Sequence, residues 1–266
     1  MTAEHVRPDG GLTEAQVAAY LERIGVPRPG GPSPEGLAVL QRAHLAAVPF
    51  ENLSVHLGEP IVLEPGALVE KIVGRHRGGF CYELNGAFGE LLRALGYRVT
   101  LLAARVFGGG RLGPPFDHMA LRVDLDGGAW LADVGFGRFS ELPLRLDRRG
   151  EQVDPGGVFT VVEHGDELDV RQDGEPQYRL DQRPYQLADF GPTCWWQATS
   201  PESHFRRSTT CSLLTADGRI TLSGTRLIRT AVDGTRTEQQ LDQDGTLAAY
   251  RTHFGIVLEQ LPGAQD

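Results

Sequence analysis

The chain has 266 residues, of which 40% are hydrophobic and 23% charged, and this composition excludes a disordered or a fibrous protein. With 35 acidic and 26 basic residues the net charge is −9, so the surface repels a phosphate backbone and nucleic-acid binding is not expected. No apolar run approaches the roughly 18 residues of a membrane span, and residues 1–11 carry charge and proline where a signal peptide is apolar. We therefore expect a cytoplasmic protein without a membrane partner.

The first 95 residues carry the signals of helices. Thr13 followed by Gln16 has the pattern of a capping box, and glycine or proline stands where each apolar run ends. We expect helices from Thr13 to Gly25, from Ser33 to Pro49, over about 66–75 and from Cys81 to Gly96. Lys71, the only lysine of the chain, is expected to be a solvated residue of the third helix.

From residue 98 onward apolar residues alternate with polar ones, and turn signals follow every eight to twelve residues, as in an antiparallel barrel or sandwich. The stretch 184–201 has the character of a linker, with Trp195 and Trp196 as a hydrophobic anchor beneath it. A last helix is expected over about 244–258. The expected strands are 98–106, 118–125, 129–136, 158–163, 167–172, 177–181, 211–215, 219–223 and 225–231.

Cys81 is a candidate nucleophile. A cysteine attacks only as thiolate, and its unperturbed pKa near 8.5 leaves a few per cent ionised at neutral pH. Cys81 stands at a predicted helix N-terminus, directly after the basic run 75–77, and both features favour the thiolate. The alternative is a small buried core residue. The three cysteines form no Cys-x-x-Cys pair, so neither a disulfide framework nor a metal site is predicted.

The hairpin 118–136 places a histidine near a carboxylate. If its loop has an even number of residues, His118 and Asp133 lie on one face, and the apolar residues Leu121, Val123 and Trp130 share the opposite, core face. A shielded carboxylate at position 133 needs a partner such as His118. Taken singly, His118 could be a surface histidine and Asp133 a turn residue. Together with Cys81 they have the order of a triad in which a carboxylate orients an imidazole that activates a thiol.

The residues around these three resemble the arylamine N-acetyltransferase family. The segment Arg77-Gly78-Gly79-Phe80-Cys81-Tyr82-Glu83-Leu84-Asn85 resembles its Arg-Gly-Gly-x-Cys-x-Glu-x-Asn signature. Segments 48–53, 117–119, 133–137 and 199–205 are similar to its other motifs, in the same order over nearly the whole chain. The chain departs from the family pattern at Asp117, where relatives often carry threonine or asparagine, and at 194–196, where many carry asparagine.

The resemblance implies an α+β protein: an N-terminal helical bundle over 1–95, a central antiparallel β-barrel over 96–190 and a C-terminal α/β lid over 191–266, with a papain-like cysteine enzyme core. It implies acetyl-coenzyme A as acyl donor, an aromatic amine or hydrazine as acceptor, no metal, and a monomer or homodimer. Catalysis then falls to Cys81, His118 and Asp133. The residues implied to contact the coenzyme are Val106, Gly135, Phe136 and Phe205.

Three other functions share parts of this pattern. A macrolactam-forming amide synthase of a polyketide pathway has the same signature and passes a long acyl chain to an intramolecular amine. A cysteine hydrolase uses the same triad but passes the acyl group to water. The protein could also be a non-catalytic binding module, in which case the presence of Cys81, His118 and Asp133 in the order of a triad would be accidental. We expect the simple acetyltransferase, working through an acetyl-cysteine.

Overall fold

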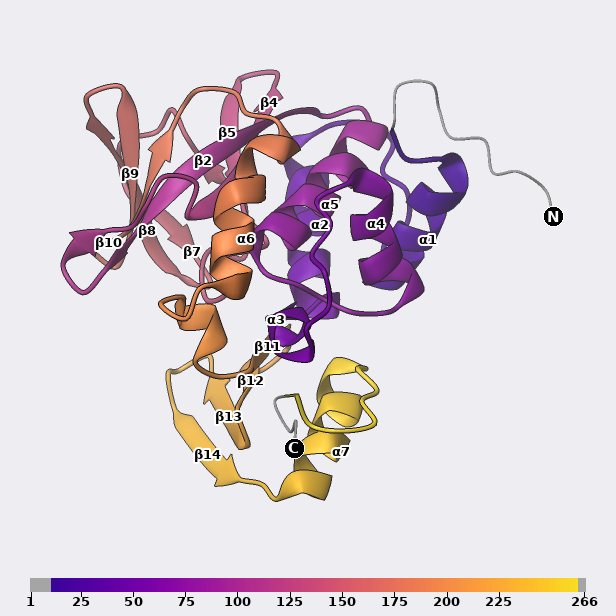
Figure 1. Ribbon diagram of the computed structural model, residues 1–266. Helices are drawn as coiled ribbons and strands as arrows, with labels where there is room; N and C mark the ends of the chain where they lie inside the picture. Colours follow the sequence, from indigo (N-terminus) through magenta and orange to yellow (C-terminus); the bar gives the residue numbers. More distant parts are fainter. Residues whose placement is uncertain (1–10, 263–266) are drawn as a thin grey trace.

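The computed structural model describes residues 11–262, and its N-terminal part is helical (Figure 1). The capping box predicted at Thr13 is present, because Thr13 Oγ1 accepts from the N–H of Gln16 at 3.2 Å and Gln16 Oε1 accepts from the N–H of Thr13 at 2.9 Å. Gly25 ends this helix with φ +70°, where glycine is favoured. The helices are α1 Glu14–Ile24, α2 Pro34–Ala47, α3 Leu53–Leu57, α4 Pro65–Val69, the π-helical turn η1 Glu70–Gly74 and α5 Cys81–Ala94.

The third predicted helix is present, but the prediction for its lysine was wrong. The helix expected over about 66–75 consists of α4 and η1, and the short helix α3 was not predicted, since it is too short to show a helical period. Lys71 in η1 is buried, with 4% of its surface exposed, so its assignment as a solvated residue was wrong.

Nine strands form one antiparallel sheet that curls beside the helices (Figure 1). Its order is β6-β5-β4-β2-β10-β9-β8-β7, and β3 pairs with β2. Residues of α5 pack against β4 and β2, so the helix that begins at Cys81 lies on this sheet. The strands are β2 Arg98–Gly108, β3 Arg111–Leu112, β4 His118–Leu125, β5 Gly128–Ala132, β6 Leu144–Arg145, β7 Gln152–Asp154, β8 Gly157–His164, β9 Glu167–Gln172 and β10 Glu175–Asp181.

The register predicted for the hairpin of β4 and β5 is confirmed. Its loop has an even number of residues, and Leu121 lies opposite Ala132. The assignment of a single core face was wrong, because both faces are buried. Leu121 packs with the helices, whereas Ala120 and Leu131, on the face of His118, belong to a second core inside the curled sheet. The histidine therefore lies at the end of the inner core.

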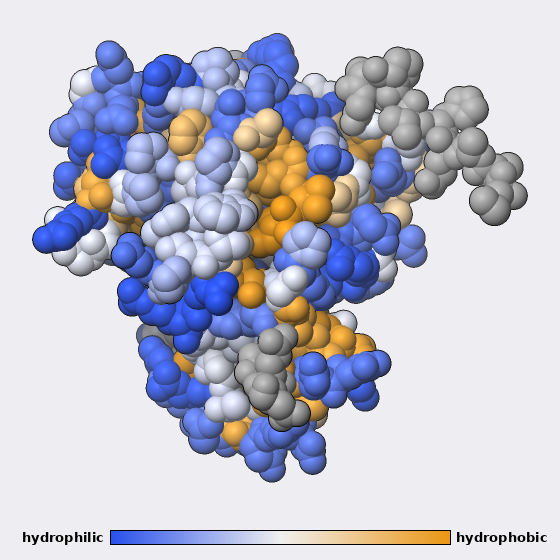
Figure 2. Space-filling view, viewed as in Figure 1, coloured by the Kyte–Doolittle hydropathy of each residue, from blue (hydrophilic) through white to orange (hydrophobic). Residues whose placement is uncertain are grey.

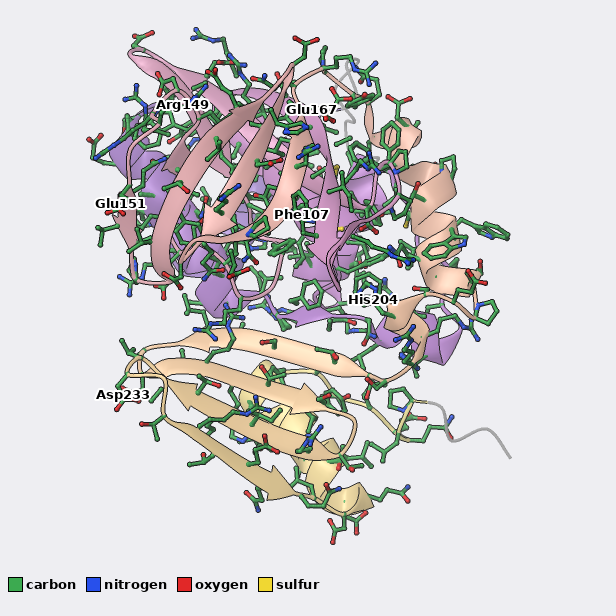
Figure 3. The ribbon with its side chains drawn as sticks, turned by 90° about the vertical axis from the view of Figure 1, so that its left-hand side faces the viewer. Phe107, Arg149, Glu151, Glu167, His204 and Asp233 are labelled. Carbon is green, nitrogen blue, oxygen red and sulfur yellow. The ribbon has the colours of Figure 1, made fainter. Side chains whose placement is uncertain are left out.

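A second, five-stranded sheet has the order β1-β11-β12-β13-β14. Its first strand, β1 Phe50–Glu51, comes from the helical part, so this pairing ties the C-terminal part to the N-terminal one. Figure 3 shows this sheet beneath the nine-stranded one, with the last helix behind it. Its other elements are β11 Thr210–Thr215, β12 Gly218–Ser223, β13 Arg226–Ala231, β14 Arg236–Gln240 and the helix α7 Gln243–Phe254.

The stretch predicted as a linker is largely helical. It contains η2 Leu187–Phe190 and α6 Gly191–Thr199, and η3 His204–Arg206 follows. Trp195 is 69% exposed and so is not a buried anchor. Apolar side chains gather beside α6 (Figure 2). A cavity of about 470 Å³ lies between α6, α3 and the segment 58–63, and Ile61, Leu63 and Cys194 are among the residues that line it.

The α+β fold predicted from the sequence is confirmed, with helices first and antiparallel sheets after residue 98. The domain limits predicted at 95/96 and 190/191 stay a prediction. Within residues 11–262, no helix combines the length and the apolar character that crossing a membrane requires.

Candidate active site

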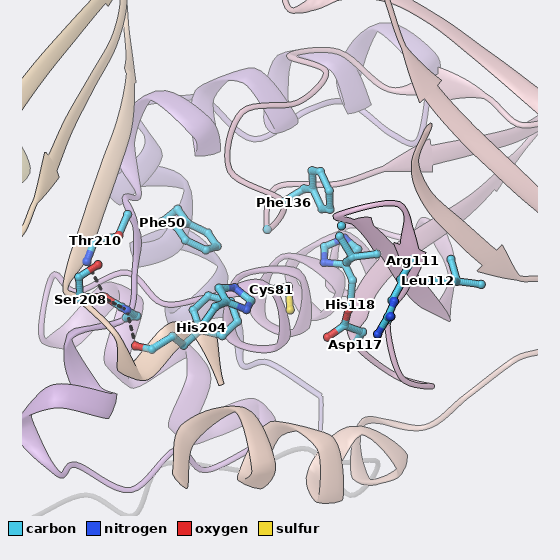
Figure 4. Close-up of a pocket in the computed structure, with 16 residues that line it drawn as sticks. Phe50, Cys81, Arg111, Leu112, Asp117, His118, Phe136, His204, Ser208 and Thr210 are labelled. Atoms are coloured by element: carbon cyan, nitrogen blue, oxygen red, sulfur yellow. Dashed lines mark hydrogen bonds between the residues drawn. The ribbon is translucent and has the colours of Figure 1, made fainter. Parts of the chain in front are cut away.

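A cavity of about 620 Å³ opens where the helical part, the nine-stranded sheet and the segment 204–210 meet (Figure 4). The sulfur of Cys81 and the ring of His118 face each other across it, and His204 lies at the junction with the second sheet (Figures 3 and 4). Its lining is mixed, with aromatic rings, backbone and a few polar groups, as in many ligand sites. The lining residues are Phe50, Asn52, Cys81, Val106, Gly108, Arg111, Leu112, Gly113, Asp117, His118, Gly135, Phe136, His204, Phe205, Ser208 and Thr210.

Cys81 is the first residue of α5, as predicted. The helix begins here because Glu83 Oε2 accepts a hydrogen bond from the N–H of Phe80 at 3.3 Å, which satisfies a backbone donor that the helix leaves unpaired. The turn before it needs glycine: a Cβ on Gly78 would lie 1.8 Å from the carbonyl oxygen of Pro49. Cys81 is therefore held at a fixed point on the cavity wall, with 4% of its surface exposed.

His118 and Asp133 form a buried pair. His118 Nε2 lies 2.7 Å from Asp133 Oδ2, and both side chains are almost fully buried. Phe136 and Tyr178 pack against the imidazole with ring centroids 5.1 Å away. Since these contacts leave the ring little freedom, it keeps one edge on the carboxylate and the other toward Cys81.

Three further groups hold the Asp133 carboxylate. Asn85 Nδ2 donates to Oδ1 at 2.8 Å, the N–H of Gly135 donates to Oδ1 at 2.9 Å, and the hydroxyl of Tyr178 donates to Oδ2 at 3.1 Å. Asn85 follows Cys81 by four residues on the same helix face, so helical spacing could have found it. Tyr178 comes from β10, and no local pattern connects it to the site.

Gly135 brings the aspartate loop against the start of α5. A Cβ at this position would lie 2.6 Å from the Cα of Cys81, closer than two such atoms can approach. A larger residue would therefore push the loop that carries Asp133 away from the helix that carries Cys81. Gly135 thus sets the distance between the two halves of the site.

The electrostatics of the pair favour the protonated form of His118. Burial lowers the pKa of His118, but the charge and hydrogen bond of Asp133 outweigh burial and raise this pKa to about 10. Burial raises the pKa of the Cys81 thiol, and the hydrogen bond and charge of His118 oppose that rise only in part. We expected the basic run 75–77 to favour the thiolate form of Cys81. This was wrong, because Arg77 donates to Glu51 at 3.0 Å and the side chains of Arg75 and His76 are exposed.

Replacing His118 with alanine is expected to raise the pKa of the Cys81 thiol further, because the change removes the hydrogen bond and the positive charge that lower it. The pH dependence of alkylation by iodoacetamide measures this shift. His204→Ala is the matched control, since His204 lines the same cavity but is not among the groups that act on the thiol. An alkylation profile unchanged by His118→Ala would show that the pair is not formed.

A buried ion-pair cluster supports the turn before Cys81. Lys71 Nζ donates to Glu83 Oε1 at 2.5 Å, and Glu51 accepts from Arg77 Nε at 3.0 Å and from the N–H of Leu53 at 2.6 Å. The two acids and two bases balance one another, as buried charges require. This cluster joins β1, η1 and α5 and explains why Lys71 is buried.

Asn52 ties the C-terminal part to the site. Its amide donates to the carbonyl oxygens of Phe205 at 2.8 Å and Ser208 at 2.9 Å, and it accepts from the N–H of Thr210 at 2.7 Å. Phe205 then packs edge-on against Phe80, with centroids 5.1 Å apart. Nothing in the sequence predicted this role, since the partners follow about 150 residues later.

The four residues predicted to contact the coenzyme are brought together. Val106, Gly135, Phe136 and Phe205 all line the cavity that holds Cys81. The glycine run after β2 also contributes, through Gly108. Their contact with a coenzyme stays a prediction, but the structure brings residues from three distant segments to one cavity.

Residues 35–262 match a family model described as N-acetyltransferase. The chain is 36% identical over 218 residues to the arylamine N-acetyltransferase / N-hydroxyarylamine O-acetyltransferase of Salmonella typhimurium, covering 79% of this chain and 78% of that protein. The chain belongs to the arylamine N-acetyltransferase family. Its fold is similar to the solved Salmonella typhimurium arylamine N-acetyltransferase, with a TM-score of 0.85, 32% identity and coverage of 96% and 94% of the two chains.

A second arylamine N-acetyltransferase structure, that of Mycobacterium marinum in complex with CoA, is similar with a TM-score of 0.83, 32% identity and coverage of 90% and 92%. Membership makes this chain an acyltransferase, as the sequence predicted. The comparisons give no support to the amide synthase that was kept as an alternative.

Proposed function

We propose that the protein transfers an acetyl group from acetyl-coenzyme A to aromatic amines or hydrazines through an acetyl-cysteine at Cys81. The observation that carries this proposal is the cavity in which the Cys81 sulfur faces an imidazole held by a buried carboxylate. The CoA complex of the Mycobacterium marinum relative supports the choice of donor. Catalysis then rests on Cys81, His118 and Asp133.

In the first half-reaction the proton of the Cys81 thiol passes to His118, and the thiolate so formed attacks the thioester carbon. A new carbon–sulfur bond forms at Cys81, the bond to the coenzyme sulfur breaks, and the leaving sulfur takes the proton from His118. The two thioesters are of similar energy, so no large uphill step is involved. Asp133 holds the imidazole in place and stabilises its charged form.

In the second half-reaction the neutral amine attacks the acetyl carbon. One N–H proton passes to His118, which is neutral after the first step, and the Cys81 sulfur leaves as thiolate, so the starting pair is restored. Backbone N–H groups at the start of α5 supply hydrogen-bond donors for the oxygen that becomes negative in each step.

The proposed donor pathway follows the cavity wall. Val106, Gly135, Phe136 and Phe205 would hold the coenzyme arm that leads to the thioester. Phe136 also touches the imidazole, with ring centroids 5.1 Å apart, so a bound arm would exclude water from His118. The oligomeric state, a monomer or a homodimer, and the cytoplasmic location stay predictions.

The test is a pre-steady-state measurement of coenzyme A release. Enzyme of known concentration mixed with an excess of acetyl-coenzyme A alone is expected to release about one thiol per active site in a burst, followed by slow hydrolysis. Adding an anisidine or an arylhydrazine should accelerate the slow phase and give parallel lines in double-reciprocal plots. If the burst occurs but the rate of the slow phase is unchanged by a panel of such acceptors, the enzyme is a hydrolase. If no burst occurs, the acetyl-cysteine intermediate is contradicted.

A further inference from the structure

Asp117 places a second carboxylate on the cavity wall, directly before His118 (Figure 4). A buried chain of hydrogen bonds orients it. Ser203 Oγ donates to Gln197 Oε1 at 2.8 Å, and Gln197 Nε2 donates to Asp117 Oδ1 at 2.7 Å. Ser203 and Gln197 are both at most 1% exposed, so these two hydrogen bonds are shielded from water and hold the carboxylate in place. The carboxylate is therefore aimed by α6 and the segment after it.

The Asp117 carboxylate is incompletely satisfied. Its partners are the amide of Gln197 and the backbone of Val106, both neutral, and a carboxylate has about four acceptor positions. Within residues 11–262 no lysine or arginine forms an ion pair with it, although Arg111 lines the same cavity. Burial raises its pKa, and its hydrogen bonds and the charges of His118 and His204 oppose that rise only in part. A hydrogen-bond donor on a ligand would fill the vacant positions.

We propose that Asp117 selects primary amines and hydrazines as acceptors by accepting the second N–H of the attacking nitrogen. This inference rests on the function proposed above. A primary amine carries two hydrogens, of which one passes to His118 and the other stays on the product amide. Asp117 binds the hydrogen that stays and gains no proton itself, so the reaction remains balanced.

The neighbouring position of the two side chains supports this division. Asp117 and His118 are consecutive, and both line the cavity into which the Cys81 sulfur points. A nitrogen near that sulfur can present one hydrogen to each. A nitrogen that bears an extra methyl group has one hydrogen, so it would turn an apolar group toward the carboxylate, which would then lose its hydrogen bonds to water. A methylated acceptor is therefore disfavoured by desolvation as well as by the missing bond.

The experiment is single-turnover discharge of the preformed acetyl-enzyme by p-anisidine and by N-methyl-p-anisidine. We expect Asp117→Asn to slow discharge by p-anisidine roughly 10- to 100-fold, the range for one hydrogen bond to a charged group, and discharge by the methylated amine less than about threefold. Asp124→Asn is the matched control, because Asp124 lies on β4, the strand that begins directly after Asp117, but outside the cavity and paired with Arg122.

The burst of coenzyme A separates this inference from the proposed function. A wild-type enzyme without a burst would contradict the proposed function itself. With the burst intact in Asp117→Asn, an equal loss for both amines, or no loss for either, would overturn the role of Asp117. Loss of the burst in Asp117→Asn alone would also overturn it, because Asp117 would then act in acetylation and not in the choice of acceptor.

Discussion

Replacing Cys81 with alanine is expected to abolish acyl transfer and the burst of coenzyme A release. The thiolate is the only group proposed to accept the acetyl group, and alanine has no nucleophilic atom. Because Cys81 contacts the core on one side, the change removes one sulfur from a packed wall and leaves the rest of the cavity in place. The measurement is coenzyme A release on mixing with acetyl-coenzyme A, with and without an arylamine.

The other two cysteines provide the matched controls. Cys194 and Cys211 are buried, and burial raises the pKa of each thiol well above the usual value. Neither lines the cavity of Cys81. Cys194→Ala and Cys211→Ala should therefore keep the burst, and neither residue should react with stoichiometric iodoacetamide. Substantial turnover by Cys81→Ala would refute the proposed mechanism.

Asp133→Asn is expected to lower kcat by a factor on the order of 10⁴, by analogy with the same exchange in a serine triad. The shape is kept, but the amide carries no charge and presents an N–H to an imidazole that needs an acceptor. The pKa of His118, raised to about 10 by Asp133, should fall in the variant, because burial then acts against the imidazolium without the carboxylate to offset it. NMR titration of the His118 ring measures this fall.

Stability must be separated from catalysis in this variant. Breaking a buried pair costs about 3–5 kcal/mol, so the melting temperature is measured alongside kcat. Asp169→Asn is the matched control: Asp169 is buried and pairs with Arg179 at 2.6 Å, outside the cavity. It should lower the melting temperature without a comparable loss of kcat. A folded Asp133→Asn enzyme with nearly normal activity would refute the assignment.

Local patterns predicted the helix starts and the pairing of His118 with Asp133. Alternation along two strands is enough to decide the register of a hairpin, and a cap needs only residues three apart. Strand β14 escaped prediction because residues 236–240 are all exposed and show no alternation of burial. Helix α6 escaped because the prolines at positions 184 and 201 suggested a linker between them.

The parts of the site that depend on distant contacts could not be predicted. Tyr178 and Asn52 reach the site through pairings of strands far apart in the chain. The effect of the basic run on Cys81 was predicted wrongly for the same reason: the sequence shows the run, but burial of the thiol and the turning of Arg77 toward Glu51 appear only in the fold. The net charge of a segment therefore does not predict the pKa of a buried side chain next to it in the sequence.

The central claim is that the acetyl group passes through Cys81. Intact-protein and peptide mass spectrometry after mixing with acetyl-coenzyme A alone tests it most directly. We predict one acetyl group per chain, on the peptide that contains Cys81, which disappears when an arylamine is added and is absent from Cys81→Ala. An acetyl group on another residue, or an adduct at Cys81 that an arylamine does not discharge, would contradict the account.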